Sequence, residues 1–306
     1  MDKKMLLIVN PCSGRARMRN ELLGVVEIFS SAGYTVTVYP TKARGDATSR
    51  VSSLGSGEYD EIVVCGGDGT LNEVITGLMR SGNKYTLGYI PSGTLNEWSS
   101  GLKISRNIKK AAEDIASGRK IKLDIGKFSG KYFSYTASFG AFTDASYSAP
   151  QDVKNVLGQA AYFFEGIKSL GNIKPVHLKF TADGRETEGD FLFGAVSNSM
   201  SVGGIVKFDE SAVKLNDGKF EILLIRNPDN ILKLQPIIDG ILKRDFNREG
   251  LEFFTAENVT VTGGDGLSWT LDGEYARGEE KTVITNLHNA IELVVPDNGG
   301  QLQITE

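Results

Sequence analysis

The sequence predicts two domains, an α/β domain with a parallel sheet followed by a mostly antiparallel β-sandwich domain. The chain has 306 residues, about twice the length of an average domain. Up to about residue 123, short apolar runs alternate with stretches of helical periodicity, which is typical of βαβ units. Beyond that point, strand-like runs separated by glycine-containing turns dominate and favour a sandwich or flattened barrel.

Four apolar strands and the helical stretches between them define the first domain. We expect strands at residues 6–9, 35–39, 61–65 and 86–90, and helices at residues 17–32, from about 46, 70–80, 94–101 and 106–117. Crossovers between parallel strands are right-handed and place helices on both faces of the sheet. The loops that follow the strands therefore meet at one edge, where open α/β sheets bind their ligands.

The second domain is predicted from shorter β-rich runs. Strands are expected at residues 131–139, 176–180, 190–197, 220–225, 258–262, 282–285 and 291–295, with helices at residues 153–170 and 230–243. Residues 286–289 are interpreted as a turn that exposes His288, and His177 is assigned to a strand without a catalytic role.

Composition excludes several classes of protein. The 34 basic and 38 acidic residues give a net charge of −4, the opposite sign to that of a general nucleic-acid binder. The sequence contains no apolar run long enough to span a membrane and no signal-peptide pattern, so we expect a cytoplasmic protein. With two cysteines and two histidines, carboxylates, hydroxyls and backbone amides must carry the chemistry.

The strongest motif follows the strand at 61–65 and opens the next helix. It reads Cys65-Gly66-Gly67-Asp68-Gly69-Thr70-Leu71-Asn72-Glu73. Glycines let the backbone approach a ligand closely, and the amino end of the helix adds a positive field, so the motif predicts a phosphate-binding turn. Asp68 suits a partner for Mg2+ or for the network around it. The alternative is a tight turn with Thr70 and Glu73 as a capping box, which leaves the three glycines unexplained.

A second turn of this kind follows the next strand. It reads Pro91-Ser92-Gly93-Thr94-Leu95-Asn96-Glu97, and Thr94 and Glu97 again fit a capping box. Residues 10–14 and Thr41 follow two further strands of the same predicted sheet. Four loops are therefore expected to converge on one crevice, as they do at ligand sites of α/β sheets.

These motifs, together with Leu271-Asp272-Gly273-Glu274, resemble the diacylglycerol kinase catalytic family. The likeness is greatest to its soluble bacterial lipid kinases, which are related to sphingosine and ceramide kinases. Residues 157–162 resemble the family's helix motif in the second domain, and residues 216–218 resemble its metal-binding loop. The resemblance implies a two-domain fold of the NAD kinase and diacylglycerol kinase type. It places residues 1–123 and 297–306 in a nucleotide-binding domain and residues 124–296 in a lipid-substrate domain.

The resemblance also implies ATP-dependent phosphorylation of a lipid hydroxyl, with Mg2+, and assigns roles to residues. The ATP-binding residues would be Asn10, Ser13, Gly14, Thr41, Gly66, Gly67, Asp68, Gly69, Thr70, Leu71, Asn72, Thr94 and Glu97. Glu274 would be the general base, and Asp272 would orient it or assist the metal. Asp217, with the carbonyls of Lys214 and Lys219, would hold a structural Mg2+ away from the chemistry.

Local alternatives remain for several of these residues. Asp272-Gly273 and Asp217-Gly218 are each also typical of a plain hairpin turn. Where the family commonly has an aspartate followed by an aromatic-small-basic run, this chain has Glu97-Trp98-Ser99-Ser100. Trp98 suits the core, a lipid cleft or a contact with the nucleotide base.

The substrate and its setting are less sharply predicted. Residues 103–122 carry seven basic and two acidic residues, which suits transient docking on an anionic inner membrane face as well as a solvated helix surface. The lipid could be a diacylglycerol, a glycolipid, an isoprenoid or a sphingoid base, and the sequence leaves open whether the chain forms a homodimer. The rival functions are an NAD kinase, which shares the Gly66–Thr70 pattern, and a non-catalytic nucleotide or lipid sensor.

Overall fold

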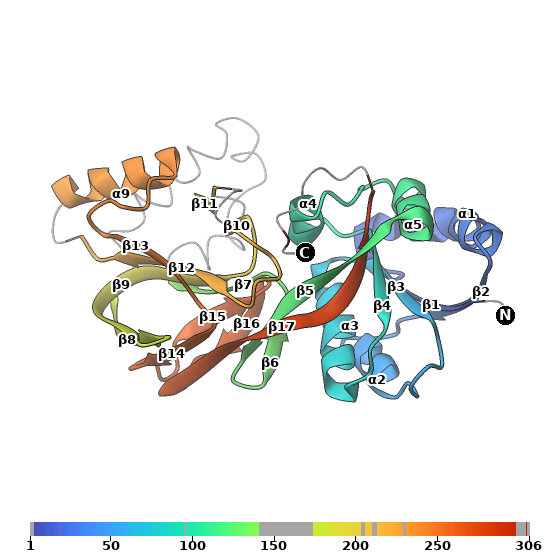
Figure 1. Ribbon diagram of the computed structural model, residues 1–306, viewed down its shortest axis with the longest axis horizontal. Helices are drawn as coiled ribbons and strands as arrows, with labels where there is room; N and C mark the ends of the chain where they lie inside the picture. Colours follow the sequence, from blue (N-terminus) through green and yellow to red (C-terminus); the bar gives the residue numbers. More distant parts are fainter. Residues whose placement is uncertain are drawn as a thin grey trace. The chain divides into compact units, whose positions relative to one another are not determined.

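The computed structural model describes residues 3–94, 96–140, 174–202, 206–209, 213–228, 231–297 and 304. The chain divides into two compact units, residues 1–125 with 288–306 and residues 126–287. Both crossings between the units fall inside strands, one in β5 (Arg119–Phe128) and one in β17 (Lys281–Val295), as Figure 1 lets the reader follow. The sequence prediction had put these boundaries after residue 123 and before residue 297.

The first unit is built on a parallel sheet in the order β17-β4-β3-β1-β2. Its other strands are β1 (Lys3–Val9), β2 (Tyr34–Pro40), β3 (Glu61–Gly66) and β4 (Thr86–Pro91). Every residue of β3 and β4 is buried, as expected for central strands covered on both faces. The predicted α/β domain with a parallel sheet is confirmed.

Helices cover both faces of this sheet. They are η1 (Ser13–Ala16), α1 (Arg17–Ser31), α2 (Asp46–Ser52), α3 (Asp68–Ser81), α4 (Glu97–Gly101) and α5 (Ile108–Ser117). Figure 1 shows α1 and α5 on one face of the sheet and α2 and α3 on the other. Gly77 allows α3 to approach α2, because a Cβ there would lie 2.7 Å from Cβ of Val51.

Two predicted helix starts and one strand need correction. The predicted helix 94–101 begins only at Glu97, after Asn96 in the left-handed region, and the predicted helix 106–117 begins at Ile108. The side chain of Asn107 caps that second helix by accepting the N–H of Lys110 at 3.0 Å. The sequence analysis also missed β5, which begins at Arg119 and therefore includes the end of the basic segment.

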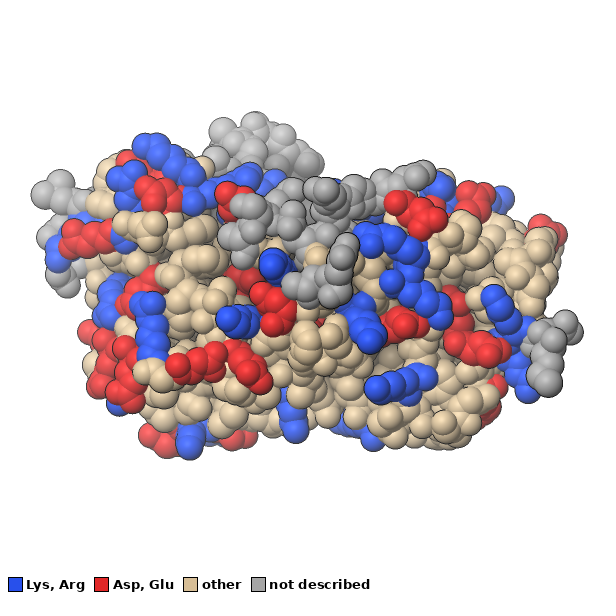
Figure 2. Space-filling model, viewed as in Figure 1, with Lys and Arg blue, Asp and Glu red and all other residues tan. Residues whose placement is uncertain are grey.

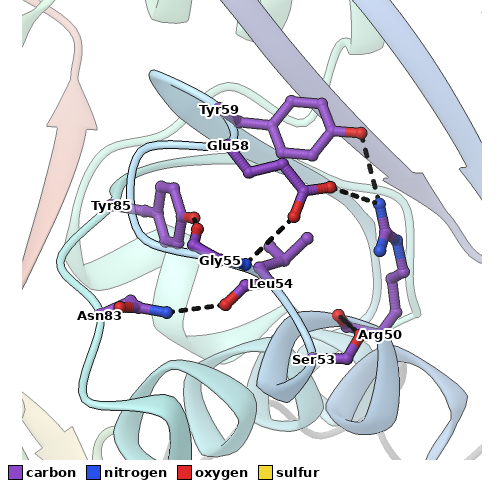
Figure 3. A network of polar contacts seen from close by, with 8 residues as sticks. All are labelled: Arg50, Ser53, Leu54, Gly55, Glu58, Tyr59, Asn83 and Tyr85. Atoms are coloured by element: carbon purple, nitrogen blue, oxygen red, sulfur yellow. Dashed lines mark hydrogen bonds and ion pairs between the residues drawn. The ribbon is translucent and has the colours of Figure 1, made fainter.

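A network of hydrogen bonds fixes the loop between α2 and β3. Figure 3 shows its residues, Arg50, Ser53, Leu54, Gly55, Glu58, Tyr59, Asn83 and Tyr85. The guanidinium of Arg50 reaches Glu58 and the hydroxyl of Tyr59, while the side chain of Asn83 donates to the Leu54 carbonyl at 2.8 Å. The network lies before the first residues of β3 and β4, at the amino-terminal edge of the sheet. It therefore anchors the edge opposite to the predicted ligand loops.

The second unit is mostly antiparallel. Its strands pair in the order β16-β15-β7-β9-β8-β14-β17, with β12 joining β9 to β13 and β6 pairing with β5. Their bounds are β6 (Lys131–Phe133), β7 (Thr136–Gly140), β8 (Val176–Ala182), β9 (Arg185–Ser197), β10 (Ser201–Val202), β11 (Val206–Lys207), β12 (Phe220–Arg226), β13 (Leu251–Ala256), β14 (Asn258–Thr262), β15 (Ser268–Leu271) and β16 (Glu274–Arg277). Aromatic side chains such as Phe139, Phe180 and Trp269 fill its core. The predicted sandwich-like second domain is confirmed.

Several predicted elements of this unit differ from the structure. The predicted strand 131–139 is interrupted at residues 134–135, where backbone N–H groups turn to a buried carboxylate described below. The predicted turn at 286–289 is wrong, because β17 runs through it as one strand. There Asn289 is left-handed (φ 51°) and donates its N–H to Asp124, so the strand is distorted but does not reverse.

Of the two helices predicted for the second domain, the structure describes one. The predicted helix 230–243 is seen as α9 (Ile231–Lys243). The predicted helix 153–170, with the motif at 157–162, lies outside the described residues, as does most of the predicted returning segment 297–306. The return to the first unit is made by β17, whose Glu292 and Leu293 pair with Thr86 and Leu87 of β4.

Candidate active site

The loops at the carboxyl edge of the parallel sheet are hydrogen-bonded to one another. Asn10, which follows β1, donates its backbone N–H to the carbonyl of Cys65 at 2.9 Å and its side-chain amide to the hydroxyl of Thr70 at 2.9 Å. Thr41, which follows β2, donates its N–H to the carbonyl of Val9 at 2.8 Å. The sequence prediction that these loops converge therefore holds within the first unit.

The structure places the predicted nucleotide residues on this edge or in the first turns of α3 and α4. They are Asn10, Ser13, Gly14, Thr41, Gly66, Gly67, Asp68, Gly69, Thr70, Leu71, Asn72, Thr94 and Glu97. Their individual contacts with ATP remain predictions. The other predicted residues, Lys214, Asp217, Lys219, Asp272 and Glu274, belong to the second unit.

The two glycine turns pack directly on each other. A Cβ on Gly93 would lie 2.6 Å from Cα of Gly67, and one on Gly67 would lie 3.3 Å from Cα of Gly93. A Cβ on Gly66 would lie 2.5 Å from Cβ of Thr70. These motifs therefore need glycine partly because the turns pack closely, in addition to any need for a phosphate to approach the backbone.

The amino end of α3 supplies the field that an anion needs. The helix begins at Asp68, and Gly67, its N-cap, is extended (φ −89°) and has no side chain to occupy the first N–H groups. The unpaired N–H groups and the helix dipole favour a negative group at such an end. Gly69 is exposed in this first turn. The arrangement is chemically suited to holding phosphate oxygens.

Asp68 is tied to the neighbouring helix. Its carboxylate accepts the N–H of Glu97 at 3.0 Å and lies 3.5 Å from the hydroxyl of Tyr89. Burial raises the pKa of Asp68, while hydrogen bonds from the backbone N–H groups of Glu97 and Trp98 oppose that rise. The side chain thus caps α4 from the first turn of α3. Its predicted role toward Mg2+ remains a prediction.

Asn96 is a residue that the sequence reading missed. It is buried, left-handed (φ 48°), and its side chain accepts the N–H of Gly93 at 3.0 Å and donates to the Gly93 carbonyl at 2.7 Å. Asn tolerates the left-handed region better than other residues, which was the available signal. Nearby, Trp98 is buried with its ring 6.4 Å from that of Tyr89, so it packs as a core side chain.

Glu73 and Thr70 do not form the capping box that the alternative interpretation required. The carboxylate of Glu73 accepts the N–H groups of Gly45 at 2.8 Å and Ala47 at 3.3 Å, and Thr70 is the partner of Asn10. The capping-box alternative is therefore wrong. Glu73 instead fastens the start of α2, and with it the loop that carries Thr41, to α3.

In the second unit, Asp272 and Gly273 form the turn between β15 and β16, and Glu274 follows it. Both turn residues are left-handed, with φ of 50° at Asp272 and 84° at Gly273, as in the hairpin that the dipeptide suggests locally. Glu274 is exposed at the first position of β16. The structure thus presents this carboxylate at a rigid turn, and its role as a base remains a prediction.

Asp272 makes contacts that the sequence did not reveal. Its carboxylate is buried and accepts three backbone N–H groups, from Ser134 at 2.5 Å, Tyr135 at 3.0 Å and Thr136 at 3.1 Å. These bonds explain why the predicted strand 131–139 breaks between β6 and β7. They also hold the turn that bears Glu274 against that break.

The predicted structural metal loop is a turn that precedes β12. The carboxylate of Asp217 accepts the N–H of Lys219 at 3.0 Å, and the side chain of Asn198 donates to the carbonyl of Leu215 at 3.3 Å. Among the described residues, no group of three or more His, Cys, Asp or Glu side chains suits a metal ion. A Mg2+ here would need backbone carbonyls and waters beside the single carboxylate, which is a donor set that Mg2+ accepts.

The basic segment 103–122 is partly neutralised by acidic neighbours. Lys110 pairs with Asp114 at 2.6 Å, and Lys120 lies 3.2 Å from Glu292. On the face drawn in Figure 2, basic and acidic side chains are interspersed. Within the part of the chain that the structure describes, no helix combines the length and apolarity needed to cross a bilayer. Membrane docking by this segment remains a prediction.

Comparisons with known proteins assign the chain to a family. Residues 4–128 match the diacylglycerol kinase catalytic domain, and residues 137–295 match the YegS C-terminal NAD kinase beta sandwich-like domain. A diacylglycerol kinase of Bacillus subtilis (strain 168) is 33% identical over 295 residues, covering 96% of this chain and 97% of that protein. The chain belongs to the diacylglycerol kinase family. It is a lipid kinase.

Other relatives agree with this family membership. A diacylglycerol kinase of Staphylococcus aureus (strain MRSA252) is 31% identical over 97% of this chain and 94% of its own length. A solved structure of a candidate diacylglycerol kinase from Bacillus anthracis str. Sterne is 27% identical, with a TM-score of 0.77 over 96% of this chain and 95% of its own. The family resemblance and fold expected from the sequence are confirmed.

Proposed function

We propose that this lipid kinase transfers the γ-phosphate of MgATP to the hydroxyl of a membrane lipid such as diacylglycerol. The observation that carries the proposal is the amino end of α3, where Gly67 leaves the first turn of the helix without a side-chain cap and the second glycine turn packs against it. Relatives named diacylglycerol kinase support the choice of acceptor. ATP is the phosphoryl donor that kinase chemistry at such a site requires.

Phosphates would be held by the first turn of α3 and by the loops bonded to it. Asn10 joins the loop after β1 to Thr70, and Glu73 joins the loop after β2 to α3, so these two loops are preorganised around the helix start. Preorganised donors stabilise developing charge without reorganising during the reaction. When bound, Mg2+ would neutralise charge on the phosphates.

Proton removal is assigned to Glu274. The lipid oxygen forms a bond to the γ-phosphorus while the bond from that phosphorus to the bridging oxygen breaks, and ADP leaves. The hydroxyl proton passes to the Glu274 carboxylate, which must come within about 3 Å of that hydroxyl. Asp272 holds the turn that bears Glu274 through its three backbone hydrogen bonds.

The enzyme would act on lipid presented at the inner membrane face while otherwise residing in the cytoplasm. Cationic side chains near an anionic surface contribute about 1 kcal/mol each, and Lys103, Arg106 and Lys122 of the basic segment are exposed. A diacylglycerol substrate is apolar enough to remain in the bilayer, so transient docking suffices.

The test is transfer of label from ATP, with Mg2+ and a total lipid extract in mixed micelles, and with NAD as a separate acceptor. Label in the organic phase supports the proposal and yields a product for mass identification. Label on NAD would instead favour NAD kinase activity, and ATP binding without either product would favour a sensor. Either of these results would overturn the proposed function.

The assignment of the base is tested with Glu274→Ala. We expect turnover to fall by about 100-fold or more, since general bases contribute at least that factor. Glu280 is an exposed glutamate in the loop between β16 and β17, so Glu280→Ala is the matched control and should retain activity. A Glu274→Ala enzyme with a near-normal rate and an intact fold would remove Glu274 from the mechanism.

A further inference from the structure

Ser92 lies where three loops of the carboxyl edge meet. It follows the last residue of β4, and only 5% of it is exposed. Its backbone N–H donates to the carbonyl of Gly66 at 2.8 Å, which joins it to the glycine turn before α3. Its side chain faces the loop after β1. Ser13 and Thr94 are among the predicted ATP-binding residues, whereas Ser92 is not.

The side chain of Ser92 belongs to a chain of hydrogen bonds. Its hydroxyl forms a short hydrogen bond with the hydroxyl of Ser13, and Ser13 donates to the carbonyl of Asn10 at 3.2 Å. Because a hydroxyl has one proton, Ser13 must accept from Ser92. Burial raises the pKa of the neighbouring Cys65 thiol to about 11, and a hydrogen bond with the Ser92 side chain opposes that rise.

The backbone of Ser92 shapes the same loop. Gly14 is left-handed (φ 54°), and a Cβ on it would lie 1.8 Å from the carbonyl oxygen of Ser92. Ser92 thus contacts Ser13 through its side chain and Gly14 through its carbonyl, while its N–H binds Gly66. Only glycine at position 14 lets the loop dock in this way, because any Cβ there would collide with the Ser92 carbonyl.

We propose that Ser92 is a positioning residue that holds residues 12–14 in the conformation that binds ATP. This inference rests on the proposed function, because it assumes that these loops receive the phosphates. Ser92 acts through Ser13 and the loop backbone, and its own hydroxyl is occupied by its partners. Loss of that hydroxyl leaves Ser13 without its donor and frees the loop, so nucleotide binding should weaken more than the chemical step.

The test compares Ser92→Ala with Thr86→Val. Thr86 is also buried in the first unit, at the amino-terminal edge of the sheet, and its hydroxyl donates to Glu292 at 2.6 Å, so it controls for loss of a buried hydroxyl away from the loops. For Ser92→Ala we expect the KM for ATP to rise about 5-fold to 10-fold, as one lost hydrogen bond implies, with kcat and the KM for lipid little changed. Thr86→Val should leave the KM for ATP unchanged. Ser92→Cys, which retains a weak donor of similar size, should recover part of the loss.

Two further measurements separate this inference from the proposed function. One is the dissociation constant of a non-hydrolysable ATP analogue measured without lipid, and the other is hydrogen exchange of the amides of residues 12–14 without nucleotide. Faster exchange and weaker analogue binding in Ser92→Ala alone support the inference even if diacylglycerol proves not to be the acceptor. Unchanged exchange, or faster exchange with unchanged analogue affinity, would overturn it. A wild-type protein that fails to bind the analogue would instead overturn the proposed function.

Discussion

Several carboxylates and amides of this enzyme bind backbone groups of the loops and helices around the site. Glu73 binds the start of α2, Asp68 binds the start of α4, and Asn96 closes the turn at Gly93. Ionised carboxylates make stronger hydrogen bonds to N–H groups than neutral acceptors do. Residues that sequence motifs assign to ligand binding therefore also hold the site together, and a loss of activity after their substitution needs a stability measurement beside it.

For Asp272, a role in holding the turn that bears Glu274 can be separated by experiment from a role in assisting the metal. Asp272→Asn keeps one oxygen, which can still accept the N–H groups of Tyr135 and Thr136, but it removes the negative charge and replaces the other oxygen by an NH2 group that cannot accept the N–H of Ser134. We expect the free energy of unfolding to fall by about 2 kcal/mol, the cost of losing hydrogen bonds to a buried charge. The Mg2+ concentration for half-maximal activity should not change.

The matched control for this change is Asp265→Asn, because Asp265 is exposed and lies 3.5 Å from Arg277. It should unfold like the parent protein in a denaturant titration. A stable Asp272→Asn enzyme with a shifted Mg2+ requirement would show that Asp272 assists the metal and would contradict the positioning role.

At the scale of elements, the two glycine turns act as one structure. They belong to different βα units, yet Gly67 and Gly93 touch through their Cα atoms, and the turns share hydrogen bonds through Asp68 and Ser92. Such an arrangement needs small residues on both sides of the contact, because a methyl group in a packed contact forces backbone shifts. The turn after β4 is thus a support for the turn after β3.

Gly93→Ala tests this packing. The added Cβ would lie 2.6 Å from Cα of Gly67 and 2.7 Å from the side-chain oxygen of Asn96. We expect a loss of about 1–3 kcal/mol in unfolding free energy, the usual cost of overpacking, together with weaker binding of an ATP analogue. Gly101→Ala is the control, since its Cβ would meet nothing within 4 Å. Equal stability and equal nucleotide affinity in both variants would argue against packed turns.

For the whole molecule, the predicted structural Mg2+ site should affect the thermal stability of the protein. If the loop 214–219 binds a structural ion, Asp217→Ala should reduce the rise in Tm that Mg2+ produces, because ligands that bind only the folded state stabilise it. Lys219→Ala is a matched control, since Lys219 would contribute only its carbonyl oxygen. Identical responses of the Asp217→Ala variant and the parent to Mg2+ in thermal melts would remove the site.

The architecture could be read from the sequence where short-range patterns specify it. The apolar runs of β1, β3 and β4, the helical periodicity of α1 and α3, and the turn chemistry of Asp272-Gly273 each depend on neighbours a few residues apart. Such patterns also predicted that the loops after the strands share one edge, because parallel strands all end there. The motifs at 66–70 and 271–274 then pointed to the family.

What local patterns could not reveal are contacts between residues far apart in the chain. Ser13 and Ser92 are 79 positions apart, and Asp272 lies 136 positions from Thr136. Nothing near Ser134 signals that its N–H binds a distant carboxylate, so the sequence did not predict the break between β6 and β7. The continuity of β17 was also missed, because Asn289 donates its N–H to Asp124, which is also distant in the chain. Secondary structure and motif chemistry follow from short-range geometry, whereas the partner of a buried polar group is selected by tertiary packing, because burial obliges each such group to find a partner wherever the fold provides one.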